Sequence, residues 1–129
     1  MKKFVTLLLC MLPVSLFAQV NDGIRQAMDN YDYETVVTLI EPDCQDSLLL
    51  ITKAQALKAM NRYPEAIGVL NSLILKDSTN TKVLIDLAEC YKLTGNSRRA
   101  ANCYQKAMNL QPENKFFRLQ FIRSLLASE

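Results

Sequence analysis

Residues 81–114 read TKVLIDLAECYKLTGNSRRAANCYQKAMNLQPEN, and this stretch decides the fold. Its apolar residues recur at spacings of three and four, which is the period of an α-helix. Gly95 interrupts the pattern near its middle and Pro112 follows its end, as expected of helix ends. The stretch therefore predicts two helices, and the short turn between them favours an antiparallel hairpin.

Nine residues of this stretch stand at the spacing Leu-x2-Leu-Ala-x2-Tyr, Gly, Ala-x3-Tyr-x2-Ala and Pro. They are Leu84, Leu87, Ala88, Tyr91, Gly95, Ala100, Tyr104, Ala107 and Pro112. The small Ala88 and Ala100 let paired helices approach closely, and the two tyrosines fill the space between hairpins. The pattern resembles the tetratricopeptide repeat. The resemblance implies an all-α fold of antiparallel helix hairpins, stacked as a short right-handed α-solenoid in which each hairpin contacts its neighbours.

Further copies of the pattern precede and follow this hairpin, and together they form one domain over residues 19–129. Residues 47–80 repeat it 34 positions upstream, with Leu50, Ala54, Leu57, Ala66, Leu70 and Leu73 in equivalent places. Residues 19–46 are a degenerate repeat whose matches lie 30 positions upstream instead, and Pro42 shortens its second helix. Residues 115–127 predict a closing helix. We therefore expect about seven helices after residue 18.

The first 18 residues have the pattern of a signal peptide. Lys2 and Lys3 precede an uncharged apolar run from Phe4 to Phe17, which ends at the small Ala18. The run is shorter than the roughly 20 residues of a membrane-spanning helix. We expect cleavage after Ala18, export to the periplasm or cell surface, and no membrane span after cleavage. An uncleaved anchor or a buried first helix is the alternative, and Leu9 before Cys10 argues against lipid attachment.

Composition disfavours several function classes. Removal of residues 1–18 leaves 13 basic and 13 acidic residues, so a nucleic-acid partner is not expected. The chain has no histidine, no glycine-rich phosphate loop and no Gly-x-Ser-x-Gly, which predicts a protein that is not an enzyme. With no Cys-x-x-Cys, no metal or other cofactor is expected either. Cys44, Cys90 and Cys103 are small buried residues or include one disulfide pair.

The resemblance implies that the first helices of the hairpins line a concave groove. The side of each first helix opposite its apolar stripe carries the candidate residues for a protein or peptide partner. They are Leu48, Ile51, Thr52, Gln55, Lys58, Lys82, Ile85, Asp86, Glu89 and Lys92. Some family members grip a terminal carboxylate through repeated asparagines, but Asp22, Thr52 and Asp86 occupy that position here, and two acids would repel it. A solvated face that binds nothing is the alternative.

The closing helix carries more apolar surface than capping requires. Phe117, Phe121, Ile122 and Leu125 are expected to cover the preceding hairpin. A second strip of Phe116, Leu119 and Leu126 predicts docking on another chain, most simply as a homodimer. The strip could instead pack sideways on the same hairpin, or the chain could be a truncated array. A self-assembling structural subunit and a carrier of a small apolar ligand stay open as alternative functions.

Overall fold

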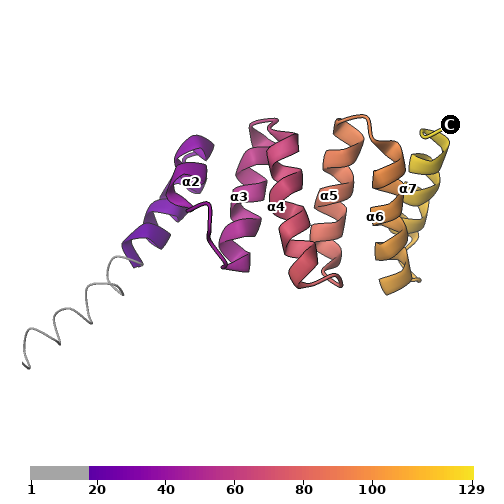
Figure 1. Ribbon diagram of the computed structural model, residues 1–129, viewed down its shortest axis with the longest axis horizontal. Helices are drawn as coiled ribbons and strands as arrows, with labels where there is room; N and C mark the ends of the chain where they lie inside the picture. The colour runs from indigo at the N-terminus through magenta and orange to yellow at the C-terminus, as the bar shows by residue number, and fades with distance from the viewer. Residues whose placement is uncertain (1–17) are drawn as a thin grey trace, which may run out of the picture.

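The computed structural model describes residues 18–129, which are helical apart from short turns (Figure 1). The predicted signal peptide, apart from Ala18, lies outside this part of the chain. A helix over residues 18–29 precedes six labelled helices: α2 (Tyr33–Leu39), α3 (Ser47–Ala59), α4 (Tyr63–Lys76), α5 (Thr81–Leu93), α6 (Ser97–Leu110) and α7 (Lys115–Leu126).

The helices stand side by side in chain order, so the molecule is an elongated stack (Figure 1). From α2 to α7, each helix packs mainly against the helices next to it in sequence. Helix 18–29 joins the stack through Ile24 and Ala27, which lie in one apolar cluster with Val36 of α2 and Ala56 of α3. The predicted all-α class and the solenoid of antiparallel hairpins are confirmed.

The ends of the helices repeat at the same interval as the sequence pattern. Asp46, Asn80 and Asn114 stand 34 residues apart and cap α3, α5 and α7, each accepting a hydrogen bond from a backbone N–H of the first turn. Such caps satisfy amide groups that have no partner inside the helix. The first helix of each hairpin therefore begins at an equivalent residue.

The first helices also end alike. The backbone N–H groups of Asp32, Arg62 and Asn96 each donate to the carbonyl five residues earlier, at 2.8–2.9 Å. The residue before each donor, Tyr31, Asn61 or Gly95, has a positive φ. This is the Schellman arrangement that ends a helix and reverses the chain.

The core lies between paired helices. Ala88 of α5 and Ala100 of α6 are fully buried, and Tyr104 fills the space beside them. Pro64 stands in the first turn of α4, where its missing amide proton costs no intrahelical bond. Close approach of α5 and α6 thus depends on small residues at two positions.

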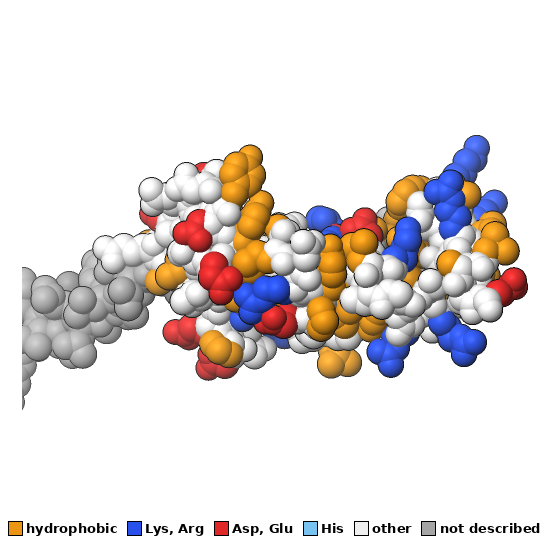
Figure 2. All heavy atoms as spheres, turned by 90° about the horizontal axis from the view of Figure 1, so that it is seen from above, with side chains coloured by type: hydrophobic (Ala, Val, Ile, Leu, Met, Phe, Trp, Pro, Cys, Tyr) orange, Lys and Arg blue, Asp and Glu red, His pale blue; other side chains and the backbone are white. Residues whose placement is uncertain are grey.

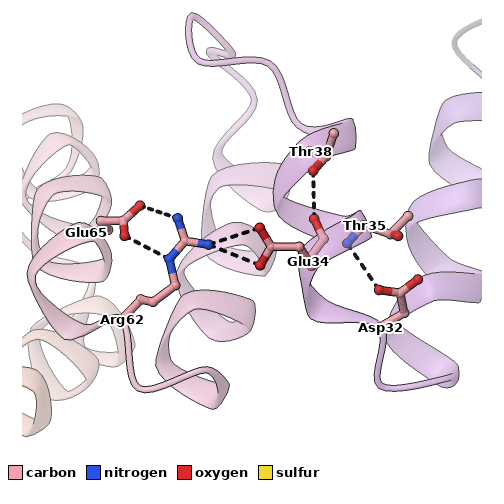
Figure 3. A network of polar contacts seen from close by, with 6 residues as sticks. All are labelled: Asp32, Glu34, Thr35, Thr38, Arg62 and Glu65. Atoms are coloured by element: carbon pink, nitrogen blue, oxygen red, sulfur yellow. Dashed lines mark hydrogen bonds and ion pairs between the residues drawn. The ribbon is translucent and has the colours of Figure 1, made fainter.

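Figure 3 shows a polar network that joins α2 to the start of α4. The Arg62 guanidinium donates to Glu65 at 2.7 and 2.8 Å and to Glu34 at 3.2 and 3.4 Å. The hydrogen bond from Arg62 is the main reason why the pKa of Glu65 lies below its usual value. Glu34 is exposed, so its ion pair with Arg62 adds little to stability.

One prediction about α7 was wrong. Phe117 is buried and Phe121 half-buried, as expected, but Ile122 and Leu125 are exposed. Gln120 and Ser124 are buried in their place. The sequence pattern of α7 is apolar on two sides, so periodicity by itself could not tell which side faces the stack.

Candidate partner-binding groove

Polar links join successive first helices along one face of the stack. Lys58 of α3 reaches α5, where its Nζ atom lies 3.1 Å from Asp86 Oδ1 and 2.8 Å from Glu89 Oε2. Lys92 of α5 donates in the same way to Gln120 Oε1 of α7, at 3.2 Å. Lys92 and Gln120 stand 34 residues after Lys58 and Asp86. The face with the predicted groove residues therefore runs from α3 across α5 to α7.

Asp86 forms the floor of this face rather than its exposed surface. It is only 8 % exposed, and Lys82 also approaches it, at 3.4 Å. Burial disfavours the charged form of Lys58, but its hydrogen bonds to Glu89 and Asp86 and the attraction of their negative charges together outweigh that effect, so its pKa is raised. The middle of this face therefore carries ion pairs whose charges balance.

The end of the groove nearest the N-terminus holds a pocket of about 420 Å³ between helix 18–29 and α3. Leu48, Thr52 and Gln55 line it, as the sequence predicts for groove residues. Its other lining residues are Asn21, Ile24, Arg25, Met28, Asp46 and Leu49. Leu48 is 74 % exposed, so a large apolar side chain stands at the mouth of the pocket.

The residues that helix 18–29 contributes to the pocket were missed in the sequence. The shift of 30 positions that aligns Asp22 with Thr52 could have found them, because it applies along the whole helix. With a shift of 30, Arg25 and Met28 correspond to Gln55 and Lys58, two predicted groove residues. Arg25 pairs with Asp22 at 2.6 Å, but both side chains are exposed, so this pair is weak.

The strip of Phe116, Leu119 and Leu126 continues the groove onto α7. These residues lie 34 positions after Lys82, Ile85 and Lys92, which are predicted groove residues of α5. All three strip residues are exposed. The strip was expected as a separate docking surface, but the repeat register and the link from Lys92 to Gln120 place it at the far end of the same face. The groove thus changes from mixed to apolar along its length.

Charge is distributed unevenly along the stack. Residues 18–79 contain nine acidic and five basic residues, whereas residues 80–129 contain four acidic and eight basic ones. Figure 2 shows the acidic side chains gathered toward one end of the visible face and the basic ones toward the C-terminal end. A near-zero net charge therefore conceals a positive end at α6 and α7.

The described cysteines and acidic residues are dispersed. No cluster of three or more metal-ligating side chains occurs from residue 18 onward. Cys44, Cys90 and Cys103 are unpaired. Burial raises the pKa of Cys103 to about 11 and also raises the pKa of Cys90, which disfavours reactive thiolates. Nor is any helix in this part of the chain long and apolar enough to span a membrane.

The comparison with known proteins decides the family. The sequence profile of the tetratricopeptide repeat matches residues 57–120. The chain belongs to the tetratricopeptide repeat family. The matched residues cover α4, α5 and α6 and half of α7, which confirms the resemblance read from residues 81–114.

A curated relative and two solved structures are similar to this tetratricopeptide repeat protein. A DnaJ homolog subfamily C member 7 homolog of Dictyostelium discoideum is 35% identical over 86 residues, or 65% of this chain. The chain spans only 16% of that relative's length.

Both structures contain a bound peptide. The Yersinia enterocolitica type III secretion chaperone SycD, in complex with a peptide of the translocator YopD, has a TM-score of 0.72 and 17% identity over 89% of this chain and 96% of that chain. The first tetratricopeptide domain of Spaghetti (RPAP3), bound to an HSP90 peptide, has a TM-score of 0.66 and 16% identity over 88% of this chain and 90% of that chain. At such identities the likeness shows the fold.

Proposed function

We propose that this tetratricopeptide repeat protein is a non-enzymatic scaffold that binds a segment of a partner protein in the groove lined by helix 18–29, α3, α5 and α7. The observation that carries the proposal is the pocket between helix 18–29 and α3, with the exposed Leu48 at its mouth. A concave apolar pocket with a few polar groups is the usual form of a binding site. The peptide complexes of SycD and Spaghetti support it by analogy of fold.

The lining of the groove suggests what the segment looks like. The pocket suits one apolar side chain, which Ile24, Met28 and Leu48 would contact. Thr52 and Gln55 can exchange hydrogen bonds with the segment's backbone. The ion pairs around Lys58 offer little net charge to the middle of the segment. A second apolar anchor would rest on the strip of α7.

The test is selection of peptides on the protein, followed by affinity measurements on matched variants. Peptides enriched from a random display library are titrated against the wild type, Leu48→Asp and Leu75→Asp. Leu75 is an exposed leucine of α4 outside the predicted groove, which makes it the matched control. We expect Leu48→Asp to weaken binding at least tenfold and Leu75→Asp to leave it unchanged. Equal affinities for wild type and Leu48→Asp would mean that the groove is not the site.

We further propose that the scaffold acts outside the cytoplasm, in the periplasm or at the cell surface. The support is the sequence pattern of residues 1–18 alone: two lysines, an uncharged apolar run and a small residue at its end. Amino-terminal sequencing of material from the exported fraction tests it. The first residue should be Gln19, and an intact Met1 in that fraction would contradict cleavage.

A further inference from the structure

One face of α7 is open where the same face of α5 is covered. Ala88 and Tyr91 of α5 are 0 % and 7 % exposed, because α5 packs between α4 and α6. Ile122 and Leu125 stand 34 positions later on α7 and are 48 % and 43 % exposed. Within the described chain α7 packs chiefly against α6, and no helix follows to cover its other side.

We call this surface the end face, and define it as Lys115, Arg118, Ile122 and Leu125. It is distinct from the groove strip of Phe116, Leu119 and Leu126. The 34-residue register indicates what kind of element can pack on the end face. In the preceding hairpin, the equivalents of Ile122 and Leu125 are covered by a helix, α6, packed antiparallel to α5. An α-helix is therefore the shape that this face accommodates.

The charge of the end face indicates the chemistry of that helix. Lys115 and Arg118 are exposed and form no ion pair with a described residue. The guanidinium of Arg118 donates to the Pro112 carbonyl, at 3.2 Å. Residues 97–129 contain six basic and two acidic residues. Unpaired cations beside apolar side chains favour a partner with acidic groups beside its own apolar stripe.

We propose that the end face of α7 docks an acidic amphipathic helix of another protein, in the place that α6 has on α5. A second copy of this chain fits less well, because a symmetric contact would bring two positively charged ends together, and like charges across an interface disfavour association. The proposal does not depend on the groove, since it uses different residues.

The probe is a helical peptide held by one Lys–Glu lactam bridge, with leucines at positions i, i+3, i+4 and i+7 and free glutamates at the other positions. Its control keeps the bridge and the leucines and carries lysines in place of the free glutamates. Fluorescence anisotropy with the whole chain should show at least tenfold tighter binding of the glutamate peptide, and added salt should weaken it. Equal binding of the two peptides would overturn the proposal.

Variants of the end face make the test specific. Ile122→Glu with Leu125→Glu should lose at least tenfold in affinity, whereas Leu119→Gln, on the groove side of α7, should not. Lys115→Glu with Arg118→Glu should reverse the preference toward the lysine peptide; because both residues are exposed, this variant stays informative even if the first one unfolds. An unreversed preference would refute the proposal. A wild-type dimer in sedimentation equilibrium that the Ile122→Glu, Leu125→Glu variant dissociates would also refute it, in favour of a second copy.

Discussion

Lys58 Nζ of α3 lies 3.1 Å from Asp86 Oδ1 of α5, and this pair joins two hairpins at the floor of the groove. Its equivalent one repeat later is the hydrogen bond from Lys92 to Gln120. In the first link a lysine pairs with a carboxylate, whereas in the second a lysine donates to the neutral side-chain amide oxygen of Gln120. Loss of the lysine should therefore matter more at position 58, where a buried carboxylate would be left behind.

Replacement of Lys58 by methionine should lower the free energy of unfolding by about 1–3 kcal/mol, because a buried charged group that loses its partner keeps its desolvation cost. Lys82→Ala is the matched control, since Lys82 approaches the same Asp86 but its side chain is 66 % exposed. That variant should cost about 0.5 kcal/mol or less. Urea denaturation measures both, and equal losses would show that the buried pair has no special weight.

Lys58 should also make stability depend on alkaline pH. Burial lowers its pKa, but the hydrogen bonds and the negative charges of Glu89 and Asp86 together outweigh burial, so the pKa lies above the ordinary 10.5 in the folded protein. Its stabilising contribution is therefore fully present below about pH 10.5 and is lost as the pH rises through the folded pKa.

Comparison of Lys58→Met with the wild type isolates this effect. The buried thiol of Cys103 acts in the same direction, because its pKa rises from 9.0 to about 11, so the unfolded state gives up this proton first and stability falls across that interval. Both proteins keep Cys103. Stability measured from pH 9 to 12 should fall less steeply in Lys58→Met, and parallel curves would contradict the assigned role of Lys58.

The hairpin of α5 and α6 and the residues at its helix contacts could be predicted from the sequence, because a few small and aromatic residues at fixed spacing make these contacts. Ala88, Ala100 and Tyr104 lie in the core as the spacing predicts. Leu48, Thr52 and Gln55 line a pocket because the helical period places them opposite the buried stripe. In both cases the helical period of one segment suffices, since the neighbouring helix is part of the same repeat or of an adjacent one.

The sequence pattern did not predict which side of α7 is buried, nor that Asp86 is buried. Two sides of α7 are apolar, and burial of Gln120 and Ser124 follows from the neighbouring helices rather than from hydrophobicity. The 34-residue register could have found Ser124, because it aligns Ser124 with Cys90, a small residue that is expected to be buried. It aligns Gln120 with Asp86, whose burial the sequence did not show. The burial of Asp86 depends in turn on a lysine that lies 28 residues away, on another helix.

Added bulk at Ala88 or Ala100 should destabilise the hairpin of α5 and α6. Both residues are fully buried, so Ala88→Leu or Ala100→Leu should overpack the contact and cost about 1–3 kcal/mol. Ala59→Leu, at an exposed position near the end of α3, is the control and should change stability little. Thermal unfolding measures all three. Unchanged melting of both core variants would mean that the helices do not meet at these residues.

The three described thiols should differ in reactivity. Cys90 and Cys103 are buried and have raised pKa values, mainly because burial disfavours the thiolate, which is the reactive form. Cys44 is only half-buried, in the segment between α2 and α3. Iodoacetamide at pH 8 should therefore label Cys44 first, with Cys90 and Cys103 following only when urea is added. Peptide mapping by mass spectrometry identifies the sites, and early labelling of Cys103 would contradict its burial.

Three equivalent turns use three different residues, and one of them is poorly suited to its conformation. Tyr31, Asn61 and Gly95 have φ values of 58°, 60° and 78°. A left-handed backbone costs an ordinary residue roughly 1–2 kcal/mol, whereas glycine adopts it freely and asparagine tolerates it. Tyr31 is 76 % exposed and its only aromatic neighbour among residues 18–129 is Tyr33, at 6.3 Å between ring centroids, so little packing offsets its strain.

Tyr31→Asn should therefore stabilise the turn between helix 18–29 and α2 by about 0.5–1 kcal/mol, because it relieves about half of a left-handed strain of roughly 1–2 kcal/mol. Gly95→Tyr should do the reverse, with a loss of about 1–2 kcal/mol, although a Cβ at Gly95 would meet no other atom within 4 Å. Tyr31→Ala separates the two causes, since it removes the ring but keeps a Cβ at positive φ. Hydrogen exchange of the amides in helix 18–29 and α2 measures the local effect. If Tyr31→Ala slowed exchange as much as Tyr31→Asn does, the exposed ring rather than the backbone conformation would be the source of the strain.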